Sequence, residues 1–318
     1  MRAQAFRQAV IAANEVYKLK EINHITIGID LGGTRIKAIA IDDTGKVLQE
    51  LYTNTNDGDD KVWKQAVQST VHELCKQFDQ TSIPVGLSAP GLPNADNSAI
   101  AFMPGRMQGL EHFNWSAFLG HPTFVLNDAV AAMMGEAKFG AAKDKLNVVM
   151  LTLGTGVGGA ILINGQPYQG QFSKAGHIGH MVIEPGGEPD VTGMPGSLEE
   201  CIGNCTIEKR TKGKYTSTAA LLDDHRNGDE YATEIWLRSV QHLALGLASI
   251  SNILSPELIV LGGGIAQAGD ALFIPLQRYM DQYEWQPGGS KTPIVKAVYG
   301  DMAGAMGAAA FAMSRSSI

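Results

Sequence analysis

A pattern of apolar strands joined by glycine turns opens the chain, from Ile25 to Tyr52 (ITIGIDLGGTRIKAIAIDDTGKVLQELY). One apolar stretch enters Gly32-Gly33, a second follows it, and the turn Asp42–Gly45 leads into a third. A related pattern returns from Val148 to Gly165 (VVMLTLGTGVGGAILING), ending on an Asn-Gly hairpin signal. Two such hairpins in one chain predict two lobes with a cleft between them.

The composition limits the classes of protein that fit. With 318 residues, 44% hydrophobic and 18% charged, the chain can form two domains with real cores. The net charge of −7 argues against a nucleic-acid partner, which needs a basic surface. No apolar run reaches the ~18 residues that cross a bilayer, so no membrane partner is expected. Three cysteines, Cys75, Cys201 and Cys205, give no disulfide framework and favour a cytoplasmic location.

The alternation of strands and helices along the chain predicts an α/β fold. Helices are expected over residues 61–78, 129–139, 231–254 and 303–313, and the last of these is expected to return to the first lobe. The predicted division is a helical extension over residues 1–24, a small lobe over 25–128 plus 301–318, and a large lobe over 129–300.

The glycine turns predict a phosphate site. Glycine lets a backbone approach a bound group, and exposed N–H groups in such turns attract anions. The segment Gly154–Gly159 matches G-x-G-x-x-G, but a β-branched run follows it instead of a helix, which disfavours a dinucleotide site. The glycines could merely permit tight turns. The hydroxyl groups of Thr34, Thr152 and Thr155 favour phosphate binding instead.

Asn127-Asp128 follows a strand and opens a helix, at the end of an α/β sheet where ligands bind. Asp128 could simply cap the helix, because Asp and Asn are favoured there. Alternatively it is a general base, since phosphorylation of an alcohol requires removal of a proton. Asp30 is a second candidate carboxylate, either a strand-end residue or a group that orients water around magnesium.

In their order and spacing these segments resemble the ROK family of kinases and repressors, over nearly the whole chain from Ile25. The matching segments are Ile29–Thr34, Ala89–Gly91, Asn127–Ala129, Leu153–Gly159 and Leu261–Gly264. The resemblance implies a two-lobed actin-like ATPase fold, related to ribonuclease H, with a central cleft. It also implies ATP-dependent phosphorylation of a hexose, most often at the 6-hydroxyl, with Mg²⁺ arriving with ATP.

The resemblance also implies the roles of individual residues. Asp128 would be the catalytic base. Sugar contacts are expected from Gly91, Asn127, His177, His180 and Glu199. ATP contacts are expected from Asp30, Gly32, Gly33, Thr34, Lys37, Thr152, Gly154, Thr155, Gly156, Gly262, Gly263 and Gly264.

The chain departs from the family pattern at two places. His177 stands where the family usually has a sugar-binding glutamate, so sugar preference is expected to change, unless His177 only packs in its loop. Asp190, Thr192 and Ser197 stand where the family has zinc-binding cysteines beside His180. Because zinc prefers Cys and His, no structural zinc is predicted. His180 would then be a sugar ligand alone, in a loop held instead by Pro185, Pro189 and Pro195.

The cysteine positions allow two interpretations. Cys201 and Cys205 could join His180 in a different metal site, although two core cysteines on one helix are the preferred interpretation. A glucokinase-like enzyme, with a homodimer as the expected assembly, is favoured over a kinase for an N-acetylated hexosamine and over a weakened sugar sensor. A transcriptional regulator is disfavoured, because only a short segment precedes the first strand and the chain is acidic.

Overall fold

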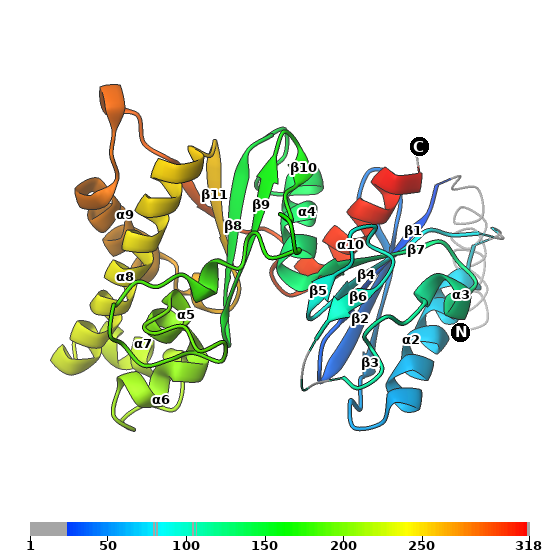
Figure 1. Cartoon of the computed structure of the whole chain (residues 1–318), viewed down its shortest axis with the longest axis horizontal. Coiled ribbons are helices and arrows are strands. Elements are labelled where there is room, and N and C mark those ends of the chain that lie inside the picture. The colour runs from blue at the N-terminus through cyan, green and yellow to red at the C-terminus, as the bar shows by residue number, and fades with distance from the viewer. Residues whose placement is uncertain (1–23, 79, 81, 104, 106, 317–318) are drawn as a thin grey trace, which may run out of the picture. The chain divides into compact units, whose positions relative to one another are not determined.

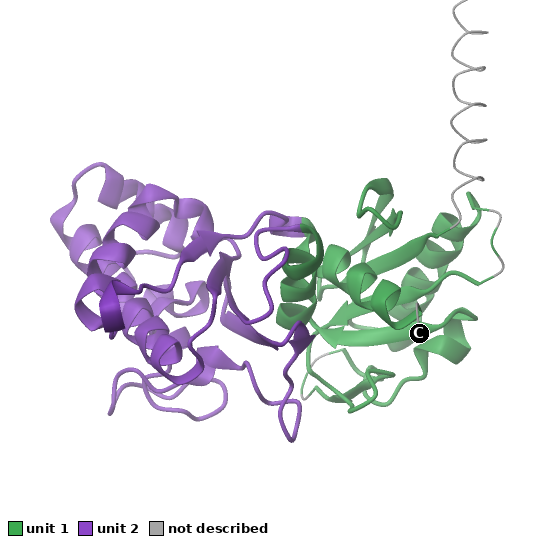
Figure 2. Ribbon diagram, turned by 90° about the horizontal axis from the view of Figure 1, so that it is seen from above, with its two compact units in different colours: residues 1–139, 302–318 green, residues 140–301 purple. Residues whose placement is uncertain are grey.

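The computed structural model describes residues 24–316 except residues 79, 81, 104 and 106. The helical extension expected over residues 1–24 therefore lies outside the described residues, apart from His24. The chain divides into two compact units, which Figure 2 shows in separate colours. Unit 1 runs to Phe139 and resumes at Met302, and unit 2 runs from Gly140 to Asp301.

Unit 1 is built on a five-stranded sheet in the order β3-β2-β1-β4-β7 (Figure 1). Its strands are β1 (Thr26–Leu31), β2 (Arg35–Ile41), β3 (Val47–Asn54), β4 (Val85–Ala89) and β7 (Thr123–Asn127). The first three pair antiparallel, whereas β4 runs parallel to β1 and β7 runs parallel to β4. The carboxyl ends of β1, β4 and β7 therefore lie at one edge, where Asp30 pairs with Ser88 and Ala89 with Asn127. A short hairpin of β5 (Leu92–Pro93) and β6 (Ile100–Phe102) follows β4.

The helices of unit 1 that contact this sheet are α2 (Asp60–Cys75), α3 (Trp115–Leu119), α4 (Asp128–Phe139) and α10 (Ala303–Ser316). Helix α2 begins where the side chain of Asp59 accepts hydrogen bonds from two backbone N–H groups of its first turn. It buries Trp63, Val67, Val71 and Leu74, which recur at helical spacing and form one face.

Small residues allow α4 and α10 to pack closely on each other and on the sheet. A Cβ atom at Gly28 or Gly86 would overlap the backbone of α10, and one at Gly307 would overlap the backbone of α4. Helix α4 is consequently part of unit 1, and the division falls after Phe139. The boundary predicted at residue 128 placed this helix in the other lobe, because its packing partner α10 is remote in sequence.

Unit 2 repeats the same arrangement in a sheet ordered β10-β9-β8-β11-β12. Strands β8 (Val148–Leu153) and β9 (Val157–Ile163) form an antiparallel hairpin that β10 (Gln166–Pro167) extends. Strand β11 (Leu258–Gly262) runs parallel to β8, and β12 (Ile294–Lys296) runs parallel to β11. Each glycine hairpin thus includes the central strand of its own sheet.

The helices of unit 2 are α5 (Leu198–Ile202), α6 (Ile207–Arg210), α7 (Thr218–Arg226), α8 (Glu230–Leu254) and α9 (Asp270–Tyr283). Short 3₁₀ turns are η1 (Ile178–His180), η2 (Asn204–Thr206), η3 (Ile265–Ala268) and η4 (Pro287–Gly289), while η5 (Gly300–Met302) precedes α10. Helix α8 buries Trp236, Val240, Leu243 and Leu247 in the core of the unit and contacts α5, α7 and α9.

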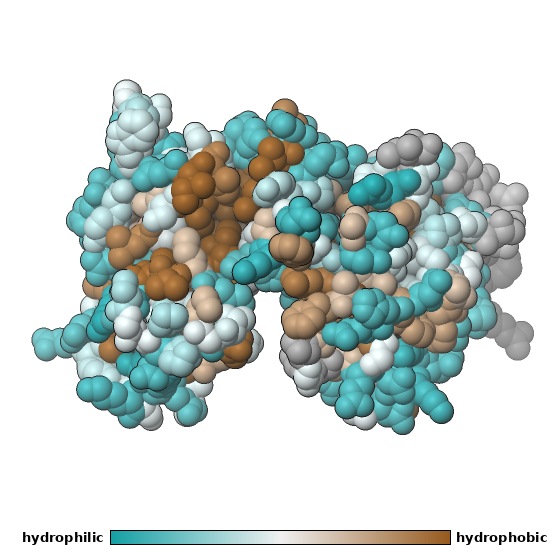
Figure 3. All heavy atoms as spheres, in the orientation of Figure 1, coloured by the Kyte–Doolittle hydropathy of each residue, from teal (hydrophilic) through white to brown (hydrophobic). Residues whose placement is uncertain are grey.

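Each unit has its own hydrophobic core. Polar side chains are mixed with apolar ones over the surface, and one face of unit 2 shows a concentration of apolar residues (Figure 3). Between residues 24 and 316, leaving out the four undescribed positions, no helix combines the length and the apolar character that a bilayer crossing requires.

Candidate active site

Asp30 lies at the carboxyl edge of the sheet in unit 1. Its Oδ1 atom accepts a hydrogen bond from the Ser88 hydroxyl at 2.9 Å, and Lys37 Nζ lies 3.9 Å from its Oδ2 atom. A Cβ atom at Gly304 would lie 2.6 Å from the Asp30 carboxylate, so this glycine permits the close approach of α10. The carboxylate therefore lies beside the first turn of α10, where helix N–H groups favour a negative charge.

The first glycine turn, residues 32–34, joins β1 to β2. The backbone N–H of Gly32 donates to the carbonyl of Arg35 at 3.2 Å, and the Thr55 hydroxyl donates to the carbonyl of Gly32 at 2.6 Å. The backbone N–H of Thr55 donates to the carbonyl of Thr34. These hydrogen bonds hold the turn in place, while Thr34 is exposed and can bind a ligand.

Asn127 and Asp128 mark the junction of β7 and α4. The Asn127 amide donates to the carbonyl of Gly91 at 3.1 Å, and its Oδ1 atom accepts from the N–H of Ala129 at 3.0 Å. Gly91 and Asn127, both predicted to contact the sugar, are thus brought together, and Asn127 is buried. Gly91 has φ +101°, a conformation that glycine adopts without strain.

Asp128 is the first residue of α4, and its Oδ1 atom accepts from the backbone N–H of Ala129 at 2.8 Å. Residue 128 keeps an exposed surface, while the protein groups around it remove water from part of its carboxyl group. This desolvation raises the pKa of the Asp128 carboxyl group above its ordinary value, and hydrogen bonds from Ala129 and Asn127 offset only part of the effect. Such a carboxylate is a stronger proton acceptor than an unperturbed one.

The second glycine turn, residues 154–156, joins β8 to β9 in unit 2. Its carbonyl groups at Gly154 and Thr155 accept hydrogen bonds from the N–H groups of Asn204 and Cys205 at 3.0 and 2.8 Å. On the other side, Glu199 Oε2 accepts from the N–H of Val157 at 2.9 Å. The segment of α5 and η2 therefore holds this turn by hydrogen bonds on both sides, while Thr155 stays exposed.

A cavity of about 550 Å³ opens beside the second turn. Its wall brings together Gly154, Thr155 and Gly264 from the predicted ATP-binding set. Gly262 ends β11, and Gly263 turns the chain with φ +84° against the backbone of Leu153. Further wall residues carried no sequence signal, since they come from helices whose positions only the fold reveals; they are Asn204, Thr218, Ala219, Leu222, Asp223, Arg226, Ile265, Gln267 and Ala268.

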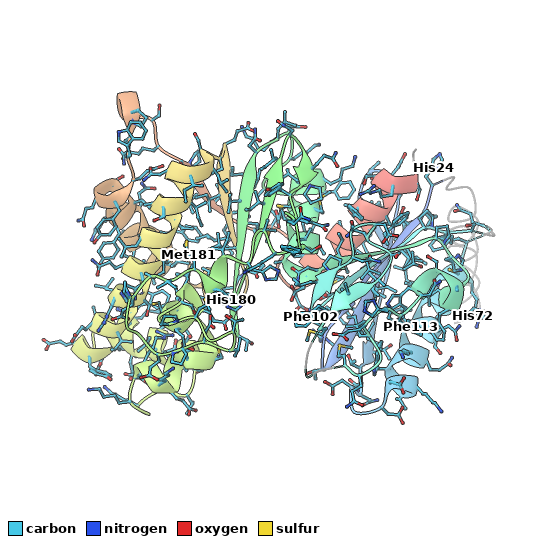
Figure 4. The ribbon with its side chains drawn as sticks, in the orientation of Figure 1. His24, His72, Phe102, Phe113, His180 and Met181 are labelled. Atoms are coloured by element: carbon cyan, nitrogen blue, oxygen red, sulfur yellow. The ribbon has the colours of Figure 1, made fainter. Side chains whose placement is uncertain are left out.

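Of the predicted sugar-binding histidines, His177 precedes η1 and His180 is its last residue. Their rings are nearly parallel, at 10°, with centroids 6.4 Å apart. Burial lowers the pKa of His177, which favours the neutral form of its ring. A Cβ atom at Gly179 would overlap the carbonyl of Val157, which shows how tightly η1 lies on β9. Figure 4 labels His180 with the adjacent Met181.

His180 is paired with a carboxylate of the loop that follows it. Its Nδ1 atom lies 2.8 Å from Asp190 Oδ2, and the Asp190 side chain is fully buried. Asp190 Oδ1 also accepts from the N–H and hydroxyl of Thr192 and from the N–H of Met194. A bridge pairs Pro189 with Pro195, but the hydrogen bonds of this loop centre on Asp190. The sequence presented Asp190 only as a poor zinc ligand.

The two cysteines of this region differ from the expectation of a shared core helix. Cys201 is buried in α5, but Cys205 is exposed on η2, because the chain turns at Gly203 between them. Among the described residues, the metal-capable group is Glu184, Cys201 and His242. The guanidinium of Arg238 already bonds Glu184 at 2.6 Å, which disfavours a cation at that place.

The two α/β units with matching sheets, each with a glycine hairpin, define a two-lobed actin-like ATPase fold. A family model described as the ROK family matches residues 26–315. The chain belongs to the ROK family.

Relatives with known names agree with this assignment. A glucokinase from Thermotoga maritima is 30% identical, covering 91% of this chain and 97% of the relative. An N-acetylmannosamine kinase from Escherichia fergusonii is also 30% identical, covering 90% of this chain and 98% of the relative. The crystal structure of a ROK family glucokinase from Streptomyces griseus, in complex with glucose and AMPPNP, has a TM-score of 0.75 at 26% identity. The matched region covers 91% of this chain and 99% of the Streptomyces griseus glucokinase chain.

Proposed function

We propose that this protein transfers the γ-phosphate of ATP to the 6-hydroxyl group of a hexose, as a glucokinase does. Membership in the ROK family and similarity to the Thermotoga maritima glucokinase support an ATP-dependent sugar kinase. The chemical step is supported by one observation: Asp128, at the exposed start of α4, has a carboxyl group with a raised pKa. Asp128 accepts the hydroxyl proton as the sugar oxygen bonds to the γ-phosphorus and ADP leaves.

The nucleotide is assigned to the glycine turns and to the 550 Å³ cavity of unit 2. The cavity suits an adenosine group, because Leu222 and Ile265 offer apolar contact while Asn204 and Thr218 offer polar groups. Backbone N–H groups of both glycine turns, with the hydroxyl groups of Thr34, Thr152 and Thr155, bind phosphate oxygens. Lys37 adds a positive charge.

Magnesium has a fitting partner in Asp30, whose carboxylate is partly exposed and is oriented by Ser88. Oxygen ligands and retained water are what Mg²⁺ prefers, so Asp30 would hold water molecules of the ion. When bound, the ion neutralises charge on the transferring phosphate.

The sugar hydroxyl groups are assigned to Asn127, His177, His180 and Glu199, with Gly91 shaping the loop beside Asn127. The neutral ring of His177 offers one donor and one acceptor, where a glutamate would offer two acceptors. This difference favours a second candidate, a kinase for an N-acetylated hexosamine, whose amide supplies both a donor and an acceptor. The Escherichia fergusonii relative agrees with that alternative.

A coupled ADP-release assay over a panel of hexoses and N-acetylhexosamines tests the proposal. Turnover with glucose or another unmodified hexose supports the leading candidate, and turnover restricted to the N-acetylated sugars supports the second. Binding of sugars without turnover of any of them would contradict both and would leave the sugar-sensor alternative.

Three further expectations belong to the same proposal. The absence of structural zinc is to be tested by metal analysis of the purified protein. The homodimer is to be tested by analytical ultracentrifugation. A cytoplasmic location is consistent with the three free cysteines and with the use of ATP.

A further inference from the structure

The loop after η1 contains one buried carboxylate with partners on both oxygens. Asp190 Oδ2 meets Nδ1 of His180 at 2.8 Å, and the Asp190 side chain has no exposure to water. Its Oδ1 atom accepts three hydrogen bonds, from the N–H of Thr192 at 2.8 Å, the Thr192 hydroxyl at 2.7 Å and the N–H of Met194 at 3.0 Å. Asp190 therefore joins the tip of its loop to the imidazole of His180.

These hydrogen bonds keep the carboxylate ionised. Burial alone would raise the pKa of Asp190, but hydrogen bonds from Thr192, His180 and Ser197 outweigh it and hold the pKa well below its ordinary value. An ionised carboxylate can only accept hydrogen bonds. The proton between the two residues consequently belongs to Nδ1 of His180, and the Nε2 atom of a neutral ring is left as an acceptor.

The backbone around His180 supports the same geometry. The N–H of His180 donates to the carbonyl of His177, and the N–H of Leu198 donates to the carbonyl of Met181 at 2.9 Å. Strand-like pairing joins Val182 to Ser197. Both chain segments that enter the loop are thus held by backbone pairing close to the contact between His180 and Asp190.

The same residues do not suit a zinc ion. By the resemblance to the ROK family, His180, Asp190, Thr192 and Ser197 occupy the four zinc-ligand positions. Here they supply one imidazole, one carboxylate and two hydroxyl groups, whereas zinc prefers thiolate and imidazole. The imidazole Nδ1 and the Thr192 hydroxyl are moreover both committed to the Asp190 carboxylate.

We propose that Asp190 is a positioning residue for sugar recognition, which takes over the structural task of a metal ion. It holds His180 as the Nδ1–H tautomer, so that Nε2 accepts a hydrogen bond from a hydroxyl group of the sugar. The proposal rests on the sugar-kinase function proposed above. It adds that sugar recognition depends on the hydrogen bond between Asp190 and His180, without a metal ion. This bond at Nδ1 determines the tautomer of the His180 ring.

The substitution Asp190→Asn tests the proposal with almost no change in shape. The Asn oxygen can still accept from Thr192 and Met194, but the Asn NH₂ group now faces Nδ1 of His180 and donates to it. The ring proton must then move to Nε2, which becomes a donor. We expect the KM for the sugar to rise at least tenfold, while the KM for ATP and kcat change less than threefold.

The matched control is Thr192→Val, which keeps the shape and the backbone N–H but removes one hydrogen bond to the other carboxylate oxygen. We expect it to lower the Tm while the KM for the sugar stays within twofold of wild type. A sugar KM in Asp190→Asn that equals that of wild type would overturn the proposal. Equal rises in both variants would also overturn it, because they would indicate a structural role alone.

Nitrogen-15 NMR of the His180 ring tests the tautomer without requiring turnover. We expect the proton on Nδ1 in the wild-type protein and on Nε2 in Asp190→Asn, with no equivalent of zinc in either. Zinc bound at one equivalent in the wild type, or a proton on Nε2 there, would overturn the proposal. If the tautomer is as expected but no sugar reacts, the kinase function fails while the role of Asp190 as the tautomer anchor stands.

Discussion

Glu199 accepts a hydrogen bond from the backbone N–H of Val157 at 2.9 Å, which ties α5 to the second glycine turn. A Cβ atom at Gly156 would overlap the Glu199 carboxylate, so the turn and the side chain fit closely. A residue expected only to bind sugar therefore also supports a turn expected to bind phosphate. In the proposed function, this one carboxylate would connect sugar binding to nucleotide binding.

Substitutions of Glu199 should separate its two contributions. Glu199→Gln keeps an oxygen acceptor for Val157 but loses the charge, so the KM for the sugar should rise about tenfold while the KM for ATP stays within threefold. Glu199→Ala removes both contacts, so both KM values should rise. Steady-state kinetics with each substrate varied provides the measurement. An unchanged KM for ATP in Glu199→Ala would contradict the proposed connection.

Thr218 provides a test of the nucleotide cavity. Its hydroxyl oxygen is buried without a hydrogen-bond partner among the described residues, while its N–H bonds Asn204 at 2.7 Å. Thr218→Val should not lower the free energy of unfolding, because an unpaired buried hydroxyl is replaced by a methyl group. The KM for ATP should nevertheless rise severalfold if this oxygen bonds the nucleotide. A variant with unchanged KM for ATP would remove Thr218 from the binding site.

The stability contribution of Asp190 should depend on pH in a defined direction. Its pKa is lower in the folded state than in the unfolded chain, so the ionised form is favoured by folding. The stabilisation is thus complete above the unfolded pKa near 4, and it is lost progressively as the pH falls from there through the lower folded pKa. Asp190→Ala should reduce the free energy of unfolding by about 2 kcal/mol at pH 7.

Urea denaturation of both proteins at pH 7 and at pH 3 measures this effect. The difference between wild type and Asp190→Ala should shrink at the lower pH. A difference that is the same at both values would show that the charge of Asp190 contributes nothing to folding.

The packing of α10 on the sheet of unit 1 should depend on Gly86. A Cβ atom there would overlap the backbone of Ala308, which cannot move without shifting the helix. Gly86→Ala should therefore cost at least about 2 kcal/mol of the free energy of unfolding. Gly58→Ala is the control, since a Cβ atom there meets no atom within 4 Å, and its effect should stay near zero. Equal stability of the two variants would refute the assignment of Gly86 to close packing.

Much of the fold could be predicted because its signals are local. The hairpins around Gly32 and Gly154 and the helices α4 and α8 follow from short-range patterns of apolar residues and glycine. The boundary between the units could not be predicted, because α4 stays in unit 1 through contacts of Gly307 in a distant helix.

The candidate site was predictable to the same degree. Asp30, Asn127 and Asp128 could be found because strand ends and helix starts carry recognisable residues. The roles of Asp190 and Thr218 could not be predicted, because they depend on groups that only the folded chain brings close to them. The exposure of Cys205 likewise depends on a turn at Gly203 that spacing alone does not indicate.

The pH dependence of catalysis should reflect the raised pKa of Asp128. A general base acts in its deprotonated form, so activity must rise as the pH increases through the pKa of the carboxyl group. Desolvation raises this pKa, and the acidic limb of kcat/KM should therefore lie above pH 4, where an ordinary aspartate titrates. A pH–rate profile that is flat down to pH 4 would contradict this role.

Parallel measurement of sugar binding and turnover in Asp128→Asn tests the central claim most directly. Asparagine keeps the shape and the helix-start hydrogen bond but cannot accept the hydroxyl proton. Isothermal titration calorimetry should give a sugar Kd within about threefold of wild type, while kcat should fall at least about 100-fold. A variant that binds sugar and retains wild-type kcat would show that Asp128 is not the base.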